Sequence, residues 1–152
     1  FFGPIVVQAF GEIGFLMVYF GSILLGNIFS LYLYKNQPWY SAIGASGGVS
    51  GILFASIAMI PDLGIMFFFI PIPIPGYIFG FLYFAYSVYM MLNPKQHDNI
   101  GHAAHLGGAF FGLVYAIALQ PERAIQNVLF LGVMALPLIY MGFQVFVKKR
   151  IG

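Results

Sequence analysis

The chain has 152 residues, of which 61% are hydrophobic and 19% aromatic, while only 7% are charged. Ordinary soluble domains carry about 25% charged residues, so these few charges cannot supply the polar surface that a soluble globule needs. The composition excludes a soluble enzyme, a disordered segment and a nucleic-acid-binding domain, which would need a basic face. The absence of cysteine excludes disulfides, thiolate metal sites and a cysteine nucleophile. We therefore predict a multi-pass integral membrane protein surrounded by the lipid bilayer.

The apolar segments can be measured against a bilayer core about 30 Å thick, which requires roughly 20 apolar residues per helix. Residues 1–10 are too short to cross it. Because the chain starts without methionine inside this apolar run, we expect this segment to be the end of a truncated helix. Five later segments are apolar enough to cross, namely residues 13–34, 46–60, 77–92, 100–119 and 128–147. The pattern predicts an all-α, polytopic membrane helix bundle.

The connections between these spans carry signals of the membrane surface. Trp39 and Tyr40 suit the level of the lipid headgroups. The Ile-Pro alternation in residues 70–76 cannot be helical, because each proline removes a backbone donor, and we expect it at the membrane surface. Residues 93–99 are predicted to form a water-exposed loop, and Pro137 is expected to interrupt the last span.

The first candidate site is the run Gly44-Ala45-Ser46-Gly47-Gly48, where a loop leads into a predicted helix. A serine in the first turn of a helix lies among unpaired backbone N–H groups, which can stabilise a developing oxyanion. An ordinary serine N-cap would give the same local pattern. The match to the G-x-S-x-G motif of soluble hydrolases carries no weight, because that motif requires a strand–turn–helix in a soluble sheet.

The second candidate site is a later span that carries His102 and His105 on one helix face. Ionisable residues within a span usually face the bundle interior or a water-filled cavity. Histidines that only hydrogen-bond between helices would satisfy this expectation too. An imidazole can also take the proton of a serine, which is otherwise a poor nucleophile. If the intervening spans alternate in direction, Ser46 and both histidines lie near the same membrane surface.

Two glycine steps favour close contact between these two spans. Gly47 and Gly51 form a G-x-x-x-G step on the serine span, and Gly108 and Gly112 form another on the histidine span. Such steps let helix backbones approach closely in a membrane. This contact is what a hydrogen bond between the serine and a histidine would need.

Together these motifs resemble the rhomboid family of intramembrane serine proteases. The resemblance rests on the runs Gly44-Ala45-Ser46-Gly47 and Ala104-His105-Leu106-Gly107-Gly108 with Gly112, separated by one span. It covers about residues 1–120 and implies a rhomboid-type protease core that lacks its first helix and most of its second. Residues 121–152 would then be an additional C-terminal hydrophobic segment with a basic tail.

The resemblance implies a Ser-His dyad, with Ser46 as the nucleophile and His105 as the general base. Four glycines are expected to serve backbone oxyanion contacts and close packing: Gly44, Gly47, Gly108 and Gly112. The implied reaction is cleavage of transmembrane segments of protein substrates, without a metal or cofactor. The implied location is the plasma membrane, with water reaching a cavity near Ser46 and the 93–99 loop. The physiological substrate and the oligomeric state stay open.

Two departures from the family pattern affect these expectations. The family's oxyanion side chains, a histidine and an asparagine on the second core helix, are absent, and we expect them upstream of Phe1. The fragment 1–152 alone is therefore expected to be inactive. Many members place a tyrosine four residues after the serine, stacked on the catalytic histidine, whereas this chain has Ser50.

The basic residues bear on the orientation in the membrane. If the serine end faces away from the cytoplasm, Lys35, Lys95 and residues 148–150 lie outside and Arg123 lies inside. This distribution opposes the positive-inside tendency. Either charges upstream of the chain decide the orientation, or the segment containing Pro137 does not cross.

Other functions fit the residues less well. A catalytically inactive rhomboid-like protein that binds transmembrane helices would not need to retain both Ser46 and His105. A transporter or channel would show inverted repeats or several intramembrane charges. A haem site is disfavoured, because haem ligands should come from opposite sides of the iron, whereas His102 and His105 lie on one helix face. A zinc protease is disfavoured, because the His-Ala-Ala-His run lacks the glutamate and the spacing of a zinc-protease helix.

Overall fold

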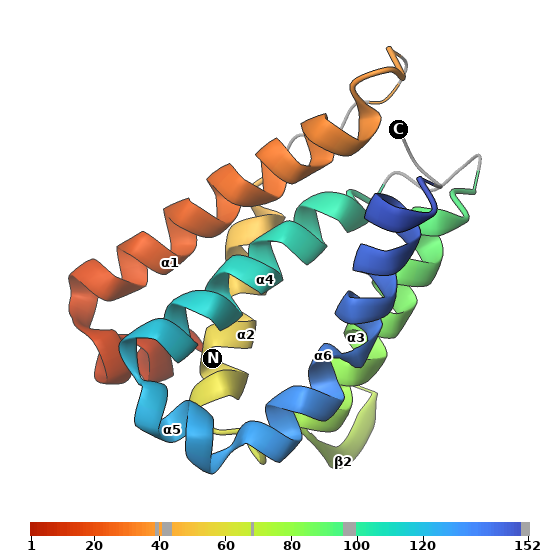
Figure 1. Ribbon diagram of the computed structural model, residues 1–152. Helices are drawn as coiled ribbons and strands as arrows, with labels where there is room; N and C mark the ends of the chain where they lie inside the picture. The colour runs from red at the N-terminus through yellow and green to blue at the C-terminus, as the bar shows by residue number, and fades with distance from the viewer. Residues whose placement is uncertain (39, 41–43, 68, 96–99, 150–152) are drawn as a thin grey trace.

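The computed structural model describes residues 1–38, 40, 44–67, 69–95 and 100–149, which form a helical bundle (Figure 1). Its elements are α1 (Gly3–Tyr34), α2 (Ser46–Met59), β1 (Gly64–Phe67), β2 (Ile70–Pro75), α3 (Gly76–Leu92), α4 (His102–Leu119), α5 (Pro121–Gln126), α6 (Val128–Gly142) and the π-helix η1 (Phe143–Val147). The predicted helical bundle is confirmed. Trp39, which was predicted to lie at the headgroup level, is outside the described residues, as are part of the 93–99 loop and the end of the basic tail.

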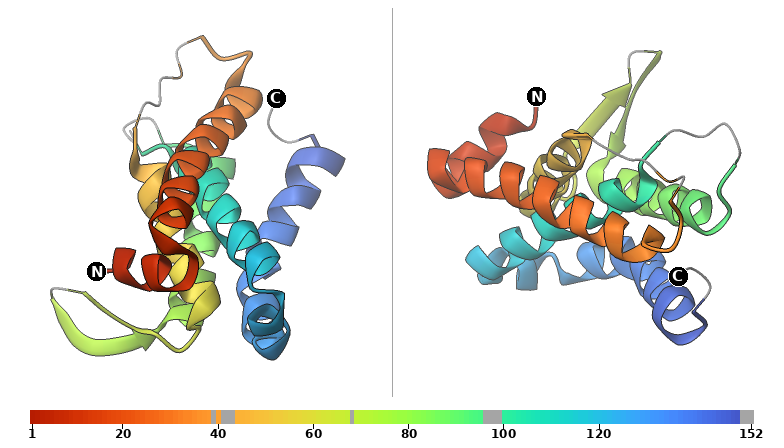
Figure 2. Two further views of the ribbon diagram at one scale, coloured as in Figure 1. Left: turned by 90° about the vertical axis from the view of Figure 1, so that its left-hand side faces the viewer. Right: turned by 90° about the horizontal axis from the view of Figure 1, so that it is seen from above.

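Helix α1 is bent at Gly11, whose φ of 74° and ψ of 176° break the helical geometry. Residues 3–10 form a short helix that lies across the long part of α1 (Figure 2). The Ser56 hydroxyl of α2 donates a hydrogen bond of 3.1 Å to the carbonyl of Phe2, which fixes the start of this short helix. The break falls where the sequence separates residues 1–10 from the span 13–34. That residues 1–10 end a longer helix stays a prediction.

The bend at Gly11 gives a first prediction for stability. Its backbone conformation is one that residues with a Cβ adopt only at a cost of order 1–3 kcal/mol. Gly11→Ala is therefore expected to lower the free energy of unfolding by about that amount, measured by denaturant titration in detergent. Gly3→Ala is the control, because its Cβ would make only an ordinary 3.4 Å contact with Phe15. Equal stabilities of the two variants would contradict the prediction.

The core of the bundle lies between α1, α2 and α4, which pack chiefly against one another. Helix α2 is buried on most of its circumference, as expected for a short helix that is apolar all round. Its largest buried side chains, Phe54 and Ile57, lie in the same cluster as Val18 of α1 and Leu106 of α4. The stacked rings of Phe54 and Phe84, 4.2 Å apart, connect this core to α3.

The residues between α2 and α3 form an antiparallel hairpin, in which Gly64 pairs with Pro75 and Ile65 with Ile74. The prediction that residues 70–76 are not helical is confirmed for residues 70–75, although the sequence did not predict a strand. It is wrong at Gly76, which begins α3, because proline restricts the residue before it and leaves the residue after it free to start a helix. Alternate prolines fit an edge strand, because an edge strand leaves half of its N–H groups unpaired. The location of this hairpin at the membrane surface stays a prediction.

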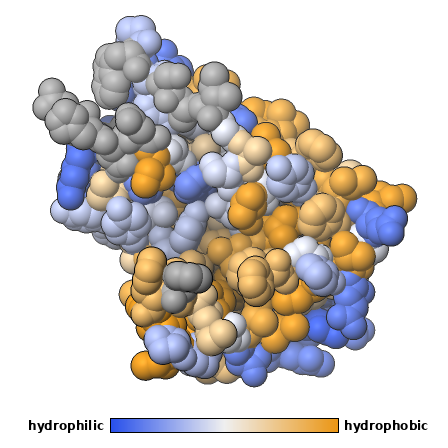
Figure 3. Space-filling view, turned by 180° about the vertical axis from the view of Figure 1, so that it is seen from behind, coloured by the Kyte–Doolittle hydropathy of each residue, from blue (hydrophilic) through white to orange (hydrophobic). Residues whose placement is uncertain are grey.

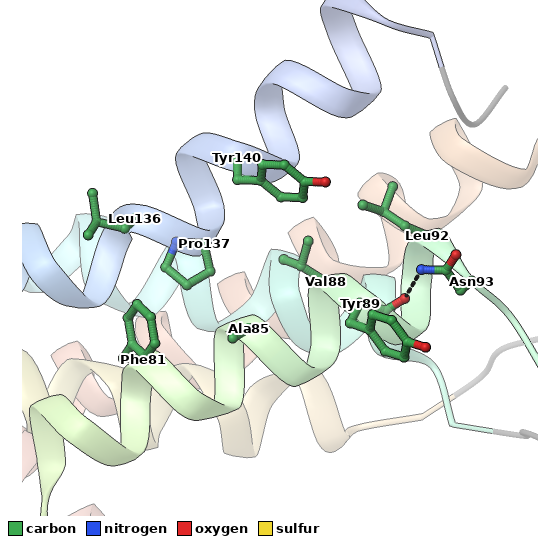
Figure 4. A pocket seen from close by; sticks show the side chains of 9 residues that line it. All are labelled: Phe81, Ala85, Val88, Tyr89, Leu92, Asn93, Leu136, Pro137 and Tyr140. Carbon is green, nitrogen blue, oxygen red and sulfur yellow. Dashed lines mark hydrogen bonds between the residues drawn. The ribbon is translucent and has the colours of Figure 1, made fainter.

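The predicted interruption at Pro137 is wrong. Helix α6 continues through this proline and runs into η1, which ends at Val147. A membrane helix tolerates proline because local adjustments of the backbone satisfy the freed carbonyl. The Pro137 ring lines a cavity of about 410 Å³ between α3 and α6 (Figure 4). The continuous helix favours a full crossing by residues 128–147.

The surface of the bundle is suited to lipid. Three helical segments are long and apolar enough to cross a membrane, namely Gly3–Tyr34, His102–Leu119 and Val128–Val147, and α2 and α3 are shorter apolar helices. Many large apolar side chains are exposed, among them Leu24, Leu129 and Ile139 at 61–73%. Figure 3 shows such side chains across the middle of one face. The chain is a multi-pass integral membrane protein.

Candidate active site

Ser46 is the first residue of α2 and is exposed at the end of the helix. Ala45 occupies the N-cap position, and α2 has no hydrogen bond from a capping side chain among the described residues. Ser46 is therefore not the N-cap that its local sequence allowed. Gly44 precedes this turn, and a Cβ there would lie 3.4 Å from the Ser46 hydroxyl. A glycine at this position leaves one side of the hydroxyl open.

His105 lies one turn into α4 and is partly buried. Its Nε2 lies 2.7 Å from the Ser46 Oγ, although the two residues are 59 positions apart in the sequence. This distance is that of a strong hydrogen bond. When Nδ1 carries the ring proton, Nε2 can accept the serine proton. The structure thus brings together the serine and the histidine that the sequence singled out.

The two glycine steps face each other between α2 and α4. A Cβ on Gly108 would collide with the carbonyl of Gly47, and a Cβ on Gly112 would collide with the carbonyl of Gly51. A Cβ on Gly47 would lie 3.1 Å from the carbonyl oxygen of Ala104, the residue before His105. The backbones therefore meet without intervening side chains. This close approach sets the distance between Ser46 and His105.

The first turn of α2 also offers backbone donors next to the serine. The N–H groups of Gly48 and Val49 bond to the carbonyl of Ala45, at 2.9 and 3.4 Å. The N–H groups of Ser46 and Gly47 precede the first intrahelical hydrogen bonds, and neither has a partner among the described residues. They are free to bind an oxygen beside the serine hydroxyl.

A tyrosine on α3 that no sequence motif indicates also reaches this site. Ser50 is buried, and its hydroxyl donates to the carbonyl of Ser46 at 3.1 Å and lies 2.9 Å from the Tyr83 hydroxyl. Tyr83 can donate to Ser50 while Ser50 donates to Ser46, so the three groups form one hydrogen-bond chain. Tyr83 belongs to no motif, and its spacing from Ser50 carries no local signal.

His102 lies outside the Ser46–His105 pair. It is 6% exposed, and its ring makes an edge contact with the ring of Tyr86, with centroids 5.6 Å apart. This contact fixes the start of α4 against α3. The described residues hold no group of three side chains of the His, Asp or Glu type that could bind a metal. The water cavity predicted near residues 93–99 falls partly outside the described residues.

Comparison with known proteins finds similarity to a protein family and to a yeast protein. Residues 1–122 match the family model described as Rhomboid domain. The chain is also 27% identical over 139 residues to a protein of Saccharomyces cerevisiae described as "Rhomboid protein 1, mitochondrial". That alignment covers 82% of this chain but only 38% of the yeast protein. No solved structure matches the chain.

Proposed function

The chain belongs to the rhomboid family, and on this premise we propose that it is an intramembrane serine endopeptidase that cleaves transmembrane segments of other membrane proteins. The observation that carries the proposal is the 2.7 Å distance between the Ser46 Oγ and the His105 Nε2. A hydroxyl becomes a useful nucleophile when a positioned base takes its proton, and a neutral imidazole can do so.

In the proposed reaction, the Ser46 Oγ attacks the carbonyl carbon of the scissile peptide bond while His105 accepts the hydroxyl proton. His105 then donates this proton to the leaving amine, and water hydrolyses the acyl-enzyme by the same steps in reverse order. No acidic side chain bonds to His105 among the described residues. Orientation of the imidazole therefore depends on the packing of α4 against α2.

The N–H groups of Ser46 and Gly47 would donate to the oxyanion that forms on the attacked carbonyl. Donors aimed at the developing charge typically contribute about 10²–10³ in rate each.

The proposed partners are transmembrane protein substrates that approach the dyad from the bilayer. A helix cannot be cut while its carbonyls are paired, so segments that unwind easily are the expected substrates. We further propose that residues 1–120 form the protease core and residues 121–152 an additional segment. The family match, which ends at residue 122, supports this division. The mitochondrial yeast relative gives no support to the predicted plasma membrane.

The proposal can be tested with the full-length protein in detergent. A fluorophosphonate probe is expected to label the protein at Ser46, and a single-span reporter protein is expected to be cleaved. Ser22→Ala is a matched control that should keep both labelling and cleavage. The Ser22 hydroxyl is buried beside α2 and has no hydrogen-bond partner among the described residues. Absence of both labelling and cleavage in folded protein would favour the inactive rhomboid-like protein that binds transmembrane helices.

The hydrogen-bond chain through Ser50 gives a prediction about turnover. Tyr83→Phe removes the donor that holds the Ser50 hydroxyl toward Ser46. A hydrogen bond of this kind is worth about 1 kcal/mol, so kcat is expected to fall about five-fold. KM for the reporter is expected to stay unchanged, because loss of the Tyr83 hydroxyl affects, through Ser50, only the turn of α2 that carries Ser46.

Two comparisons distinguish positioning from a general loss of stability. Tyr89→Phe is the matched control, since Tyr89 is on the same helix and is 59% exposed. The double variant Ser50→Ala/Tyr83→Phe is expected to turn over no more slowly than Ser50→Ala alone, because both changes remove the same link. Additive losses would contradict a shared hydrogen-bond chain.

A further inference from the structure

Two neighbouring cavities lie where the C-terminal end of α1 meets α6 and η1. The first has a volume of about 520 Å³ and is bounded by α1, α4 and α6, with Leu25, Leu106 and Leu138 among its lining residues. The second has a volume of about 270 Å³ and is lined by Lys35, Asn36 and Lys149. Tyr32 and Phe146 line both cavities. The first cavity is therefore an apolar compartment, and it adjoins the second cavity, which is a cationic compartment.

The cationic compartment is formed by side chains from two separate parts of the chain. Lys35 follows α1 directly and Lys149 lies just beyond η1, and the two lysines line the same cavity, which lies on the side of the bundle where these ends are drawn in Figure 2. The Lys35 ammonium lies 5.3 Å from the centre of the Tyr32 ring, and the rings of Tyr32 and Phe146 are 6.4 Å apart. Neither lysine forms an ion pair with a described residue. Two uncompensated positive charges thus converge on one small cavity.

The apolar compartment is open because α6 packs on α3 and leaves the adjoining faces of α1 and α4 uncovered. Phe110 and Phe146, which line it, are 53% and 57% exposed. A helix about 10 Å across occupies roughly 400 Å³ per turn. The part of the cavity enclosed by its walls, about 520 Å³, is therefore comparable to little more than one helical turn. An extended hydrocarbon chain fits it better.

We propose that these two cavities form a binding site for one anionic phospholipid, whose phosphate lies between Lys35 and Lys149 and whose acyl chain fills the apolar compartment. The charge of the headgroup complements the two lysines, and basic side chains between membrane helices bind anionic headgroups in this way. The cavity between α3 and α6 in Figure 4 lacks this character, because no charged residue lines it.

The site adjoins the back of the dyad helix. Leu106 and Gly107, which line the apolar compartment, directly follow His105 in α4. A bound acyl chain would pack against the turn that carries the histidine. The lipid site does not depend on catalysis, so its test uses binding as the readout.

The test places the full-length protein in nanodiscs of phosphatidylcholine with a minor share of phosphatidylglycerol, and native mass spectrometry counts the lipids that stay bound. We expect one phosphatidylglycerol per protein, enriched on the order of ten-fold over its share of the bilayer, as two cations at a membrane surface would give. Lys35→Gln/Lys149→Gln is expected to abolish the enrichment. Inorganic phosphate at millimolar concentration is expected to leave it unchanged.

Matched controls separate this site from the general charge of the surface. Lys95→Gln/Lys148→Gln also removes two positive charges, but neither residue lines the cavities, so enrichment should persist. Gly142→Leu would fill the apolar compartment, since a Cβ on Gly142 meets nothing within 4 Å, and Gly132→Leu is its control in the same helix outside the cavity. Equal loss in both lysine pairs, displacement by inorganic phosphate, or full retention in Gly142→Leu would each overturn the proposal.

Discussion

Ser46→Ala and His105→Ala are each expected to reduce cleavage of a transmembrane reporter by at least about 10³-fold, because each removes one partner of the nucleophile–base pair. Both variants are also expected to lose fluorophosphonate labelling. In the proposed mechanism the two side chains act as one unit, and the 2.7 Å contact between them supports this. The double variant Ser46→Ala/His105→Ala should therefore be no slower than either single variant, since residues that act as a unit give strongly non-additive effects.

The controls for this prediction address folding and chemistry separately. The two variants are expected to unfold at nearly the same temperature as the natural protein, because Ser46 is exposed and His105 is only partly buried. His102→Ala removes a second imidazole from the same helix but leaves the dyad contact, so it should retain labelling in the fraction that folds. Undiminished cleavage by Ser46→Ala, or labelling that persists in it, would contradict the proposed nucleophile.

Gly112→Ala and Gly108→Ala are expected to be among the most destabilising single-methyl additions in the bundle. In each case the added Cβ meets a backbone carbonyl of α2, which cannot move away as the end of a flexible side chain could. We expect a loss of about 2–3 kcal/mol in the free energy of unfolding, the upper part of the range typical of overpacked cores. Because separation of α2 and α4 also separates Ser46 from His105, cleavage should fall in parallel.

Gly132→Ala is the matched control for this pair of variants. It makes the same change within a helix, but a Cβ at this position meets nothing within 4 Å. Its stability should be unchanged or slightly raised, because alanine loses less backbone entropy than glycine on folding. Denaturant titration of the three variants in one detergent checks both expectations. Equal stability of Gly112→Ala and Gly132→Ala would show that α2 and α4 are not held by backbone contact.

The class of the protein and the positions of its helices follow from the sequence because hydropathy and proline act locally. Few charges and five apolar runs are enough to predict a membrane bundle, and the start of α2 at Ser46 agrees with the predicted span. The Ile-Pro run is visibly non-helical for the same local reason. Its partner strand β1 was missed, because four residues of ordinary apolar sequence carry no pairing signal. The rule that a proline interrupts a helix fails at Pro137, since α6 continues through this residue.

Ser46 and His105 could be chosen from the sequence because their motifs combine residue types that are rare inside membrane helices. The hydrogen bond between them, the link from Ser50 to Tyr83 and the paired cavities beside Lys35 and Lys149 are visible only in the tertiary structure. The physical reason is that these helices are apolar on nearly every face, since lipid and protein interior are equally apolar environments. Hydrophobic periodicity then does not tell which face of a helix meets its neighbour. Backbone contact at the glycines fixes that rotation, and with it the residues that meet.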